Sequence, residues 1–323
     1  MKIAAFTSCN YAYMPNARIV ANSAKEHQAN WDFYLLFNDR QHFSYDWDLE
    51  PFDFVTHIED LDLQGRSFYK WVFQYNVIEL CTATKGIMSI YLLRELGYDA
   101  VVYLDPDTRL FSPLVEVEEL IKNGVGCILT PHLTDAEEDQ YSIWSHEMAA
   151  LKHGTFNLGF FVFTNTKNGN QALDWWAQRL LDYSHIDFER GLFTDQKWAN
   201  IMPYIFDDIV VLRDRAYNVA TWNMKNRKIE YNSQSSSWKV NGNPLRFYHF
   251  SGFGKDFAWA NHELKHLSPN PDLIKLWDLY KELYANNQTS GEHQWFWGYS
   301  GNGIQIIDEK RSQYSSSIIY PYE

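Results

Sequence analysis

Short apolar runs and longer amphipathic stretches alternate along most of the chain. The apolar runs have the length of strands, and we expect strands at residues 3–7, 33–37, 54–58, 101–104, 126–130, 156–163 and 209–212. Helical periodicity predicts helices at residues 18–27, 75–96, 170–183 and 273–284, and Gly97 is well placed to end the second of them. Strands that alternate with helices in this way predict an α/β fold.

Composition adds a domain organisation to this pattern. The chain has 323 residues, of which 46% are hydrophobic and 21% are charged, as in a globular protein with a sizeable core. We find no internal repeat and no linker-like stretch. We therefore expect one domain at residues 1–256 and a helical, aromatic-rich extension at residues 257–323 that packs on it.

The charge balance argues against a general nucleic-acid binder. The formal net charge is −13, whereas a protein that follows a phosphate backbone needs a basic surface. The three cysteines are far apart in the sequence, so neither a disulfide framework nor a zinc site is expected. No stretch approaches the ~20 apolar residues of a membrane span. We expect a cytoplasmic protein whose aromatic tail leaves room for a peripheral contact at the inner face of the membrane.

Two carboxylates directly follow the apolar run at residues 101–104. Side chains at i and i+2 of an extended backbone point the same way, so Asp105 and Asp107 are able to reach one divalent cation together. The same Asp-Pro-Asp-Thr letters are also ordinary turn chemistry. The predicted helix at residues 75–96 leads into this strand, so Lys85 would approach the same cleft. The glycine-rich dinucleotide fingerprint and the P-loop are both missing from the sequence.

Five ordered motifs together resemble the family 8 type of retaining nucleotide-sugar glycosyltransferases, which have a GT-A-type fold. The similarity covers about residues 1–256. The motifs are the strand with Asp105 and Asp107, the Asn157 to Gly159 strand, the block from Asp195 to Asn200, the His249, Gly252 and Lys255 pattern, and the Thr130 to Thr134 segment, which resembles uncharacterised bacterial glycosyltransferases in particular. The resemblance implies a Rossmann-like domain with a central, mixed but mostly parallel sheet flanked by helices.

The resemblance also assigns residues to a metal and to a nucleotide. It implies that Asp105, Asp107 and His249 hold a divalent cation. Such ligands suit Mn²⁺ better than Ca²⁺, and Mg²⁺ is the alternative cation. Gly252 and Lys255 would contact the phosphates of the donor. The turn after the first strand would hold the base through Thr7, Ser8, Asn10 and Tyr11. The family usually has acidic residues where this chain has Ser8 and Cys9, which weakens the case for uridine.

The donor sugar is the third group that the resemblance places. Asn157, Asp195 and Gln196 would hold its hydroxyl groups at the reacting face, although a helix N-cap is an alternative role for Asp195. The resulting prediction is a metal-dependent glycosyltransferase. It would move a hexose from a UDP-sugar to a glycan or lipid-linked acceptor of a bacterial surface polysaccharide, with retention of anomeric configuration.

Two other functions remain open at this point. A haloacid-dehalogenase-type phosphatase would use Asp105 as nucleophile and Asp107 as general acid/base, with Asp207 and Asp208 as its later acidic pair. A non-enzymatic sugar-binding protein would use the aromatic residues, which make up 17% of the chain, as stacking platforms. Core filling by large rings is the plainer reason for that aromatic content.

Overall fold

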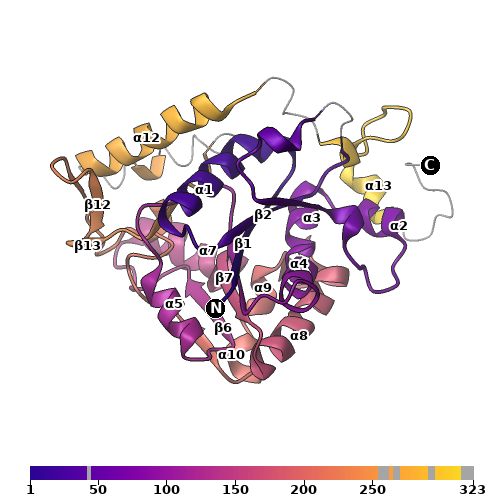
Figure 1. The fold of residues 1–323 in the computed structure, drawn as a ribbon, viewed down its shortest axis with the longest axis horizontal. Coiled ribbons are helices and arrows are strands. Elements are labelled where there is room, and N and C mark those ends of the chain that lie inside the picture. Colours follow the sequence, from indigo (N-terminus) through magenta and orange to yellow (C-terminus); the bar gives the residue numbers. More distant parts are fainter. Residues whose placement is uncertain (42–44, 254–261, 265–269, 290–294, 314–323) are drawn as a thin grey trace.

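The computed structural model describes residues 1–41, 45–253, 262–264, 270–289 and 295–313. A seven-stranded sheet crosses the molecule between two layers of helices (Figure 1). Its strands lie in the order β10 (Ile209–Val211), β6 (Cys127–Pro131), β7 (Phe156–Thr164), β4 (Ala100–Leu104), β1 (Ile3–Cys9), β2 (Asp32–Phe37) and β3 (Phe54–His57).

The sheet is mixed but mostly parallel. Strand β7 runs antiparallel to both of its neighbours, β4 and β6, while the other neighbouring pairs are parallel. Every residue of β1, β4 and β7 is buried, because helices cover both faces. The predicted α/β fold class is confirmed, and the central strands begin within a residue of the predicted positions.

Each face of the sheet has its own hydrophobic core. On one face, Ala4 and Phe6 of β1 pack with apolar residues of α2 (Phe68–Phe73), α3 (Val77–Ala83), α4 (Lys85–Ile90) and α8 (Lys167–Tyr183). On the other face, Ile3 and Ala5 pack against α1 (Met14–His27) and α5 (Val115–Lys122). The alternation of side chains along β1 thus serves both cores.

A third cluster joins the late part of the chain to the edge of the domain. It contains a three-stranded ribbon, β11 (Ile229–Asn232), β12 (Ser237–Val240) and β13 (Asn243–Pro244), and the helix α12 (Pro271–Asn287). Helix α12 packs along α1, where the Asn16 amide donates to the Tyr280 hydroxyl at 2.8 Å. None of the helices in the described residues is long and apolar enough to cross a membrane.

The C-terminal segment contributes to the first core. Trp297 of η7 (Phe296–Gly298) and Ile306 belong to it, and α13 (Asp308–Gln313) follows them. The buried Arg311 guanidinium donates to the carbonyl oxygens of Phe73 and Tyr75 at 3.0 and 2.9 Å. The described parts of residues 257–323 therefore lie against the residues 1–256 rather than apart from them.

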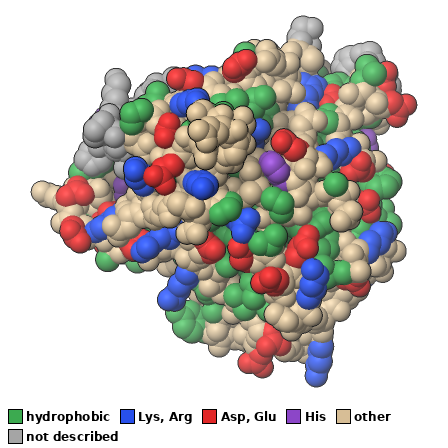
Figure 2. Space-filling view, turned by 60° about the vertical axis from the view of Figure 1, so that its left-hand side comes forward, with side chains coloured by type: hydrophobic (Ala, Val, Ile, Leu, Met, Phe, Trp, Pro, Cys, Tyr) green, Lys and Arg blue, Asp and Glu red, His purple; other side chains and the backbone are tan. Residues whose placement is uncertain are grey.

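Short helical turns and ribbons complete the structure. They are η1 (Tyr11–Tyr13), η2 (Trp47–Leu49), η3 (Ile58–Asp60), η4 (Tyr91–Glu95), α6 (Gln140–Ser142), η5 (Ile143–Glu147), α7 (Met148–His153), α9 (Gln196–Ala199), α10 (Met202–Ile205), η6 (Thr221–Asn223), and the pairs β5 (Thr108–Leu110) with β14 (Phe247–His249) and β8 (Ile186–Asp187) with β9 (Leu192–Phe193). Acidic and basic side chains are interspersed on the face that Figure 2 shows.

The expected single helix at residues 75–96 is wrong in its continuity. The Asn76 side chain caps the backbone N–H groups of Ile78 and Glu79, so that α3 begins there. Thr84 separates α3 from α4, and the last turn, η4, widens to a π-helix before Gly97 takes a φ of +70°. The helical pattern was therefore real. The structure divides it into α3, α4 and η4, although i→i−4 hydrogen bonds from Thr84 to Leu80 and from Met88 to Thr84 continue across the first division.

The packing of α4 on α8 predicts that Gly86→Ala destabilises the fold. Alanine in place of glycine favours a helix by about 1 kcal/mol. Here, however, a Cβ would lie 2.6 Å from Ala177 Cα and 2.8 Å from Ala177 Cβ, so two backbones would have to separate. Overpacking of this kind costs about 1–3 kcal/mol, and we expect a net loss of unfolding free energy in urea.

The exposed Gln171 on α8 provides the control for that experiment. Gln171→Ala changes the helix surface without touching α4, so its effect should stay within about 0.5 kcal/mol. A Gly86→Ala variant as stable as the wild type would show that α4 and α8 can separate without loss.

Candidate functional site

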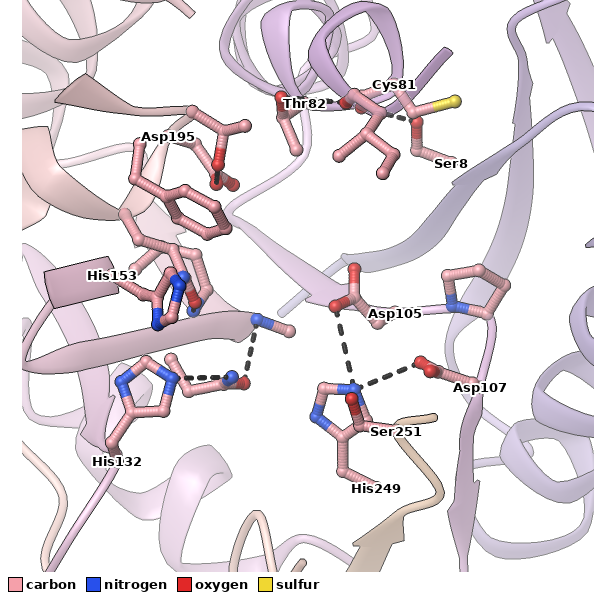
Figure 3. A pocket seen from close by; sticks show the side chains of 18 of the residues that line it. Ser8, Cys81, Thr82, Asp105, Asp107, His132, His153, Asp195, His249 and Ser251 are labelled. Atoms are coloured by element: carbon pink, nitrogen blue, oxygen red, sulfur yellow. Dashed lines mark hydrogen bonds and ion pairs between the residues drawn. The ribbon is translucent and has the colours of Figure 1, made fainter. Parts of the chain in front are cut away.

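A cavity of about 720 Å³ opens at the carboxyl ends of β1 and β4, where β7 begins (Figure 3). This volume lies in the range of small-molecule sites, and open α/β sheets place their ligands at this edge. The predicted site residues that line the cavity are Ser8, Asn10, Lys85, Asp105, Asp107, Asn157, Asp195, Gln196, His249 and Gly252. The predicted Lys255 lies outside the described residues.

Thr7 and Tyr11 lie beside the cavity but do not line it. Along β1, Ser8 faces the cavity, and its neighbour Thr7 necessarily points to the opposite face of the sheet. Tyr11 is buried in the α1 core, with its ring 4.6 Å from that of Phe37. Two of the four predicted side chains of the base-binding turn, Ser8 and Asn10, therefore line the cavity, and the roles of Thr7 and Tyr11 stay predictions.

A tight turn aims both carboxylates of the Asp105 to Asp107 segment. The Thr108 backbone N–H and hydroxyl both donate to the Asp105 carbonyl, at 3.0 and 2.7 Å. The Asp105 N–H donates to the Gly159 carbonyl at 2.8 Å, which ties the turn to β7. The turn and the metal hypotheses for this segment are therefore compatible, since the turn itself brings the carboxylates to one side.

The β5–β14 ribbon brings His249 to these carboxylates. His249 pairs with Thr108 in the antiparallel ladder, although 141 positions separate them in the sequence. The imidazole Nε2 lies 3.0 Å from Asp107 and 3.8 Å from Asp105. One ligand atom of each of the three residues lies within 4.8 Å of the others, as a single cation requires.

Asn218 sets the orientation of the His249 ring. Its amide oxygen lies 3.3 Å from His249 Nδ1, which must carry the proton because an amide oxygen only accepts. The Asn218 amide nitrogen in turn donates to the Asn157 oxygen at 3.0 Å, and Asn157 donates to His132 Nε2 at 3.1 Å. This chain leaves His249 Nε2 directed at the carboxylates, as in many metal sites.

Gly159 keeps the space between the three ligands open. A Cβ on Gly159 would lie 2.6 Å from the His249 ring and 2.8 Å from an Asp105 carboxylate oxygen. Its N–H donates to the Asn157 amide oxygen at 3.0 Å. A glycine in this apolar strand predicts that another group lies close to the backbone. The groups that lie close to Gly159 are the polar side chains of the cavity.

A buried ion pair lies next to the cluster. Lys85 Nζ is 2.8 Å from Asp195 and 3.4 Å from Asp105, and both Lys85 and Asp195 are almost fully buried. The Tyr103 hydroxyl donates to Asp105 at 2.6 Å. Three carboxylates and one ammonium leave two negative charges in the cavity while His249 is neutral. This excess matches the charge of one divalent cation.

The charges in the cavity shift one another's pKa values. Burial alone would lower the pKa of His249, but the Asp107 and Asp105 carboxylates outweigh it and raise that pKa. Burial also acts against the Lys85 ammonium, and its carboxylate partners again raise the pKa above the usual value. Burial raises the pKa of Asp195 despite Lys85. The carboxylates of the cavity therefore favour the protonated forms of both His249 and Lys85.

The alternative role of Asp195 as a helix N-cap is wrong. Asp195 does occupy the N-cap position of α9, but its side chain accepts no hydrogen bond from that helix. Its carboxylate instead accepts from Lys85 and from the Thr194 hydroxyl at 3.1 Å.

The outer wall of the cavity is held by a second buried charge cluster. His146, which lines the cavity, has Nδ1 3.0 Å from Glu137 and Nε2 3.1 Å from Glu263. The Tyr141 hydroxyl also bonds to Glu263. Burial lowers the pKa of His146, but the two glutamates outweigh this and raise it; burial raises the pKa of Glu263, but His146 outweighs it and lowers that pKa.

Sequence reasoning missed Asn218, His146 and Tyr103. Asn218 adopts a φ of +46°, a conformation that Asn tolerates better than most residues, so a lone Asn after an aromatic was the only hint. Tyr103 precedes Asp105 by two residues on one face of the strand, and this spacing was available in the sequence. His146 has no sequence signal, because Glu263 lies 117 positions away.

Asn218→Gly should weaken Mn²⁺ binding. Glycine accepts the positive φ, so the variant removes the acceptor for His249 Nδ1 without backbone strain. Loss of such an orienting partner costs about 10–100-fold in metal affinity, which isothermal titration calorimetry would measure. Asn226→Gly is the matched control, since Asn226 is exposed and has a φ of +58°. Equal affinity in both variants would contradict the role assigned to Asn218.

The His146 cluster should stabilise the protein most between weakly acidic and neutral pH. A raised His146 pKa contributes stability that is present below the unfolded value of about 6.5 and is lost as pH rises through the folded value. A lowered Glu263 pKa contributes stability that is lost as pH falls through its folded value. We therefore expect His146→Gln to lower Tm most near about pH 6 and less at alkaline pH.

His185→Gln is the control for this pH series. His185 Nδ1 lies 3.8 Å from Glu79 at a more exposed position, where screening limits the contribution of a pair. A Tm difference for His146→Gln that does not change with pH would argue against a charged His146.

Comparisons with known proteins show which sequences and structures the chain is similar to. No protein-family model matches the chain. It is 24% identical over 234 residues to the uncharacterized protein YfnD of Bacillus subtilis strain 168, covering 72% of each chain. It is 26% identical over 213 residues to YfnF of the same strain, covering 63% of this chain and 66% of that protein.

A solved glycosyltransferase structure shares the fold. The galactosyltransferase LgtC, in complex with donor and acceptor sugar analogues, superposes with a TM-score of 0.50 at 12% identity, over 90% of this chain and 98% of LgtC. Lower scores relate the chain to GlyE of Streptococcus pneumoniae TIGR4 (0.40, 17% identity, 68% and 47% covered) and to mouse xyloside xylosyltransferase 1 (0.44, 14% identity, 77% and 97% covered). The chain has the GT-A glycosyltransferase fold, while membership of family 8 stays a prediction.

Proposed function

We propose that the protein is a metal-dependent glycosyltransferase. It moves a hexose from a UDP-sugar to a glycan or lipid-linked acceptor in the synthesis of a bacterial surface polysaccharide, with retention of configuration. The observation that carries this proposal is the Asp105, Asp107 and His249 cluster, which lies beside a buried Lys85–Asp195 pair in a cavity of a GT-A fold. The donor, the acceptor and the stereochemistry rest on the family resemblance.

The three ligands fit Mn²⁺ or Mg²⁺ on several grounds. Their ligand atoms converge, Gly159 leaves the space between them clear, and His249 Nε2 is free to coordinate because Asn218 holds Nδ1. A mixed carboxylate and imidazole set favours Mn²⁺. When bound, the cation would neutralise the charge that develops on the diphosphate as the sugar leaves.

The nucleotide would lie between the cluster and the end of β1. Ser8 and Asn10 line that end of the cavity, and the Ser8 hydroxyl is held by the Cys81 carbonyl at 2.8 Å and the Asn38 amide at 2.8 Å. Gly252, with a φ of +79°, would let the backbone approach the phosphates. Lys255 is proposed as their point charge.

Lys85 is proposed to support the donor site through Asp105. Its ammonium lies next to the carboxylates of Asp195 and Asp105, and it donates to the Leu158 carbonyl at 3.1 Å. It therefore offsets part of the negative charge of the site. In this arrangement it lowers the repulsion between carboxylates before any donor arrives. Its contribution to the donor is thus electrostatic rather than a direct reaction step.

Asn157, Asp195 and Gln196 are proposed to position the donor sugar. The Gln196 amide oxygen accepts from the Leu158 N–H at 3.2 Å, which leaves its amide N–H groups for the sugar. Asp195 is already paired with Lys85, so its carboxylate suits hydrogen bonding better than nucleophilic attack. Among the described residues, the carboxylates that line the cavity belong to Asp105, Asp107 and Asp195, and each is paired with Lys85 or His249, which supports retention by return at the donor.

The phosphatase alternative loses its second acidic pair in this fold. Asp207 and Asp208 precede β10, which runs parallel to β6 and in the same direction as β4. They therefore lie at the opposite end of the sheet from Asp105. Asp208 is hydrogen-bonded there to Asn168.

Asp107→Ala should abolish sugar transfer while the protein stays folded. The variant removes one cation ligand but keeps the backbone carbonyl of residue 107, which accepts from the Phe250 N–H at 2.8 Å and holds the ribbon. A screen of UDP-sugars with Mn²⁺, read as UDP release, would measure the loss, and far-UV circular dichroism would report folding. Asp48→Ala removes an exposed carboxylate that does not line the cavity and should leave activity unchanged.

The same screen separates the alternatives. A fully active Asp107→Ala variant would rule out the metal assignment. Release of phosphate from p-nitrophenyl phosphate without any UDP dependence would support the phosphatase. Glycan binding that survives both a chelator and Asp105→Ala, with no turnover, would support a sugar-binding protein.

A further inference from the structure

His153 presents one unpaired nitrogen to the cavity. It is the last residue of α7 and lines the cavity wall. Its Nδ1 lies 3.0 Å from the Ala149 carbonyl oxygen, which can only accept, so Nδ1 carries the proton and Nε2 keeps a lone pair. Among the described residues, no hydrogen-bond donor reaches Nε2.

Two phenylalanines hold the His153 ring in this orientation. The ring meets Phe193 edge to face with centroids 4.6 Å apart, and Phe188 at 5.6 Å. Phe188 and Phe193 stack on each other at 5.6 Å with an interplanar angle of 15°. Burial, together with the Lys152 and Lys197 ammonium groups, lowers the pKa of His153, so the ring is neutral near pH 7.

This corner of the cavity lies between the reacting groups and the surface. Gly154, the next residue, packs against Gln196, and Phe193 is two residues from Asp195. Figure 3 shows His153 and Asp195 on one side of the cavity and Asp105 and Asp107 on the other. Phe188, by contrast, is 44% exposed. A molecule that enters over Phe188 would meet His153 before it meets the site proposed for the donor.

The chemistry of this corner suits a sugar. A sugar ring presents hydroxyl donors at its edge and an apolar C–H face, and the corner offers a fixed acceptor beside the ring of Phe193. Ala149 and Ala150 also line the wall, while the Lys152 ammonium lies over the ring of Phe188, 4.4 Å from its centroid. The donor's own polar partners are the metal cluster and Asp195, both of which lie deeper.

We infer that His153 Nε2 accepts a hydrogen bond from a hydroxyl of the acceptor sugar, whose ring rests on Phe193. This inference rests on the proposed glycosyltransferase function. It adds a specificity-determining residue to the acceptor side of the cavity. The acceptor is accordingly a glycan that presents a hydroxyl donor to His153 at the position nearest the donor.

The test compares His153→Phe and His153→Gln with the wild type. Phenylalanine keeps the aromatic packing but removes the acceptor, while glutamine retains an acceptor oxygen at a similar reach. Leu151→Ala is the control on the same helix, since Leu151 is 70% exposed and does not line the cavity. The probes are UDP with Mn²⁺ for the donor side, and a panel of methyl hexosides and neutral disaccharides as acceptors for UDP-hexoses.

We expect His153→Phe to raise the acceptor KM about tenfold, the effect of one lost hydrogen bond. His153→Gln should recover most of this loss. UDP affinity and the slow hydrolysis of the UDP-hexose by water should stay at the wild-type level in both variants, which a merely structural role for His153 would not allow.

Each other outcome has a distinct meaning. An unchanged acceptor KM in His153→Phe would overturn the inference alone. Equal losses of UDP affinity and acceptor binding would also overturn it, because His153 would then act on the donor side or on the fold. A folded wild-type protein that turns over no UDP-hexose would overturn the proposed function, and the acceptor role would fall with it.

Discussion

Repulsion between three carboxylates is the constraint around which this site is built. Asp105, Asp107 and Asp195 line one cavity at one end of the sheet, where Asp195 is almost fully buried and Asp105 and Asp107 are partly buried, so like charges interact more strongly than in water. The Lys85 ammonium offsets one of these charges. Asp107 and Asp105 raise the pKa of His249, which favours a proton on its imidazole and so a positive charge beside them. A divalent cation would neutralise the remaining negative charge. Binding of the cation would therefore also relieve the repulsion between the carboxylates.

Strand pairing between distant parts of the sequence brings the site residues together. The β5–β14 ribbon places His249 beside Asp107, and β7 supplies Asn157 and Gly159 from a strand that runs against its neighbours. Asn218 then links His249 to Asn157. Asp105 and His249 therefore have partners behind them, Tyr103 and Asn218, and the Asp107 backbone is held by Phe250, an arrangement that suits a preorganised metal site.

The sequence predicted the parts of this structure that depend on local pattern. Strand positions, the α/β class and the residues of the metal cluster follow from apolar runs, the spacing of Asp105 and Asp107, and the family resemblance. It did not predict features that depend on tertiary contacts. The direction of β7, the pairing of Lys85 with Asp195, and the Glu137–His146–Glu263 cluster join residues far apart in the sequence, and no local signal marks such pairs. The division of the 75–96 helix at Thr84 was missed because Thr84 keeps helical backbone angles and no glycine or proline marks the position.

The central claim is that one cation is held by Asp105, Asp107 and His249. Pulsed electron paramagnetic resonance of the protein with Mn²⁺ and UDP tests it most directly, because a coordinated imidazole gives a nitrogen coupling. The account predicts one tightly bound Mn²⁺ with this coupling in the wild type, and loss of the coupling in His249→Gln. Bound Mn²⁺ without nitrogen coupling in the wild type, or the same coupling in His249→Gln, would contradict it.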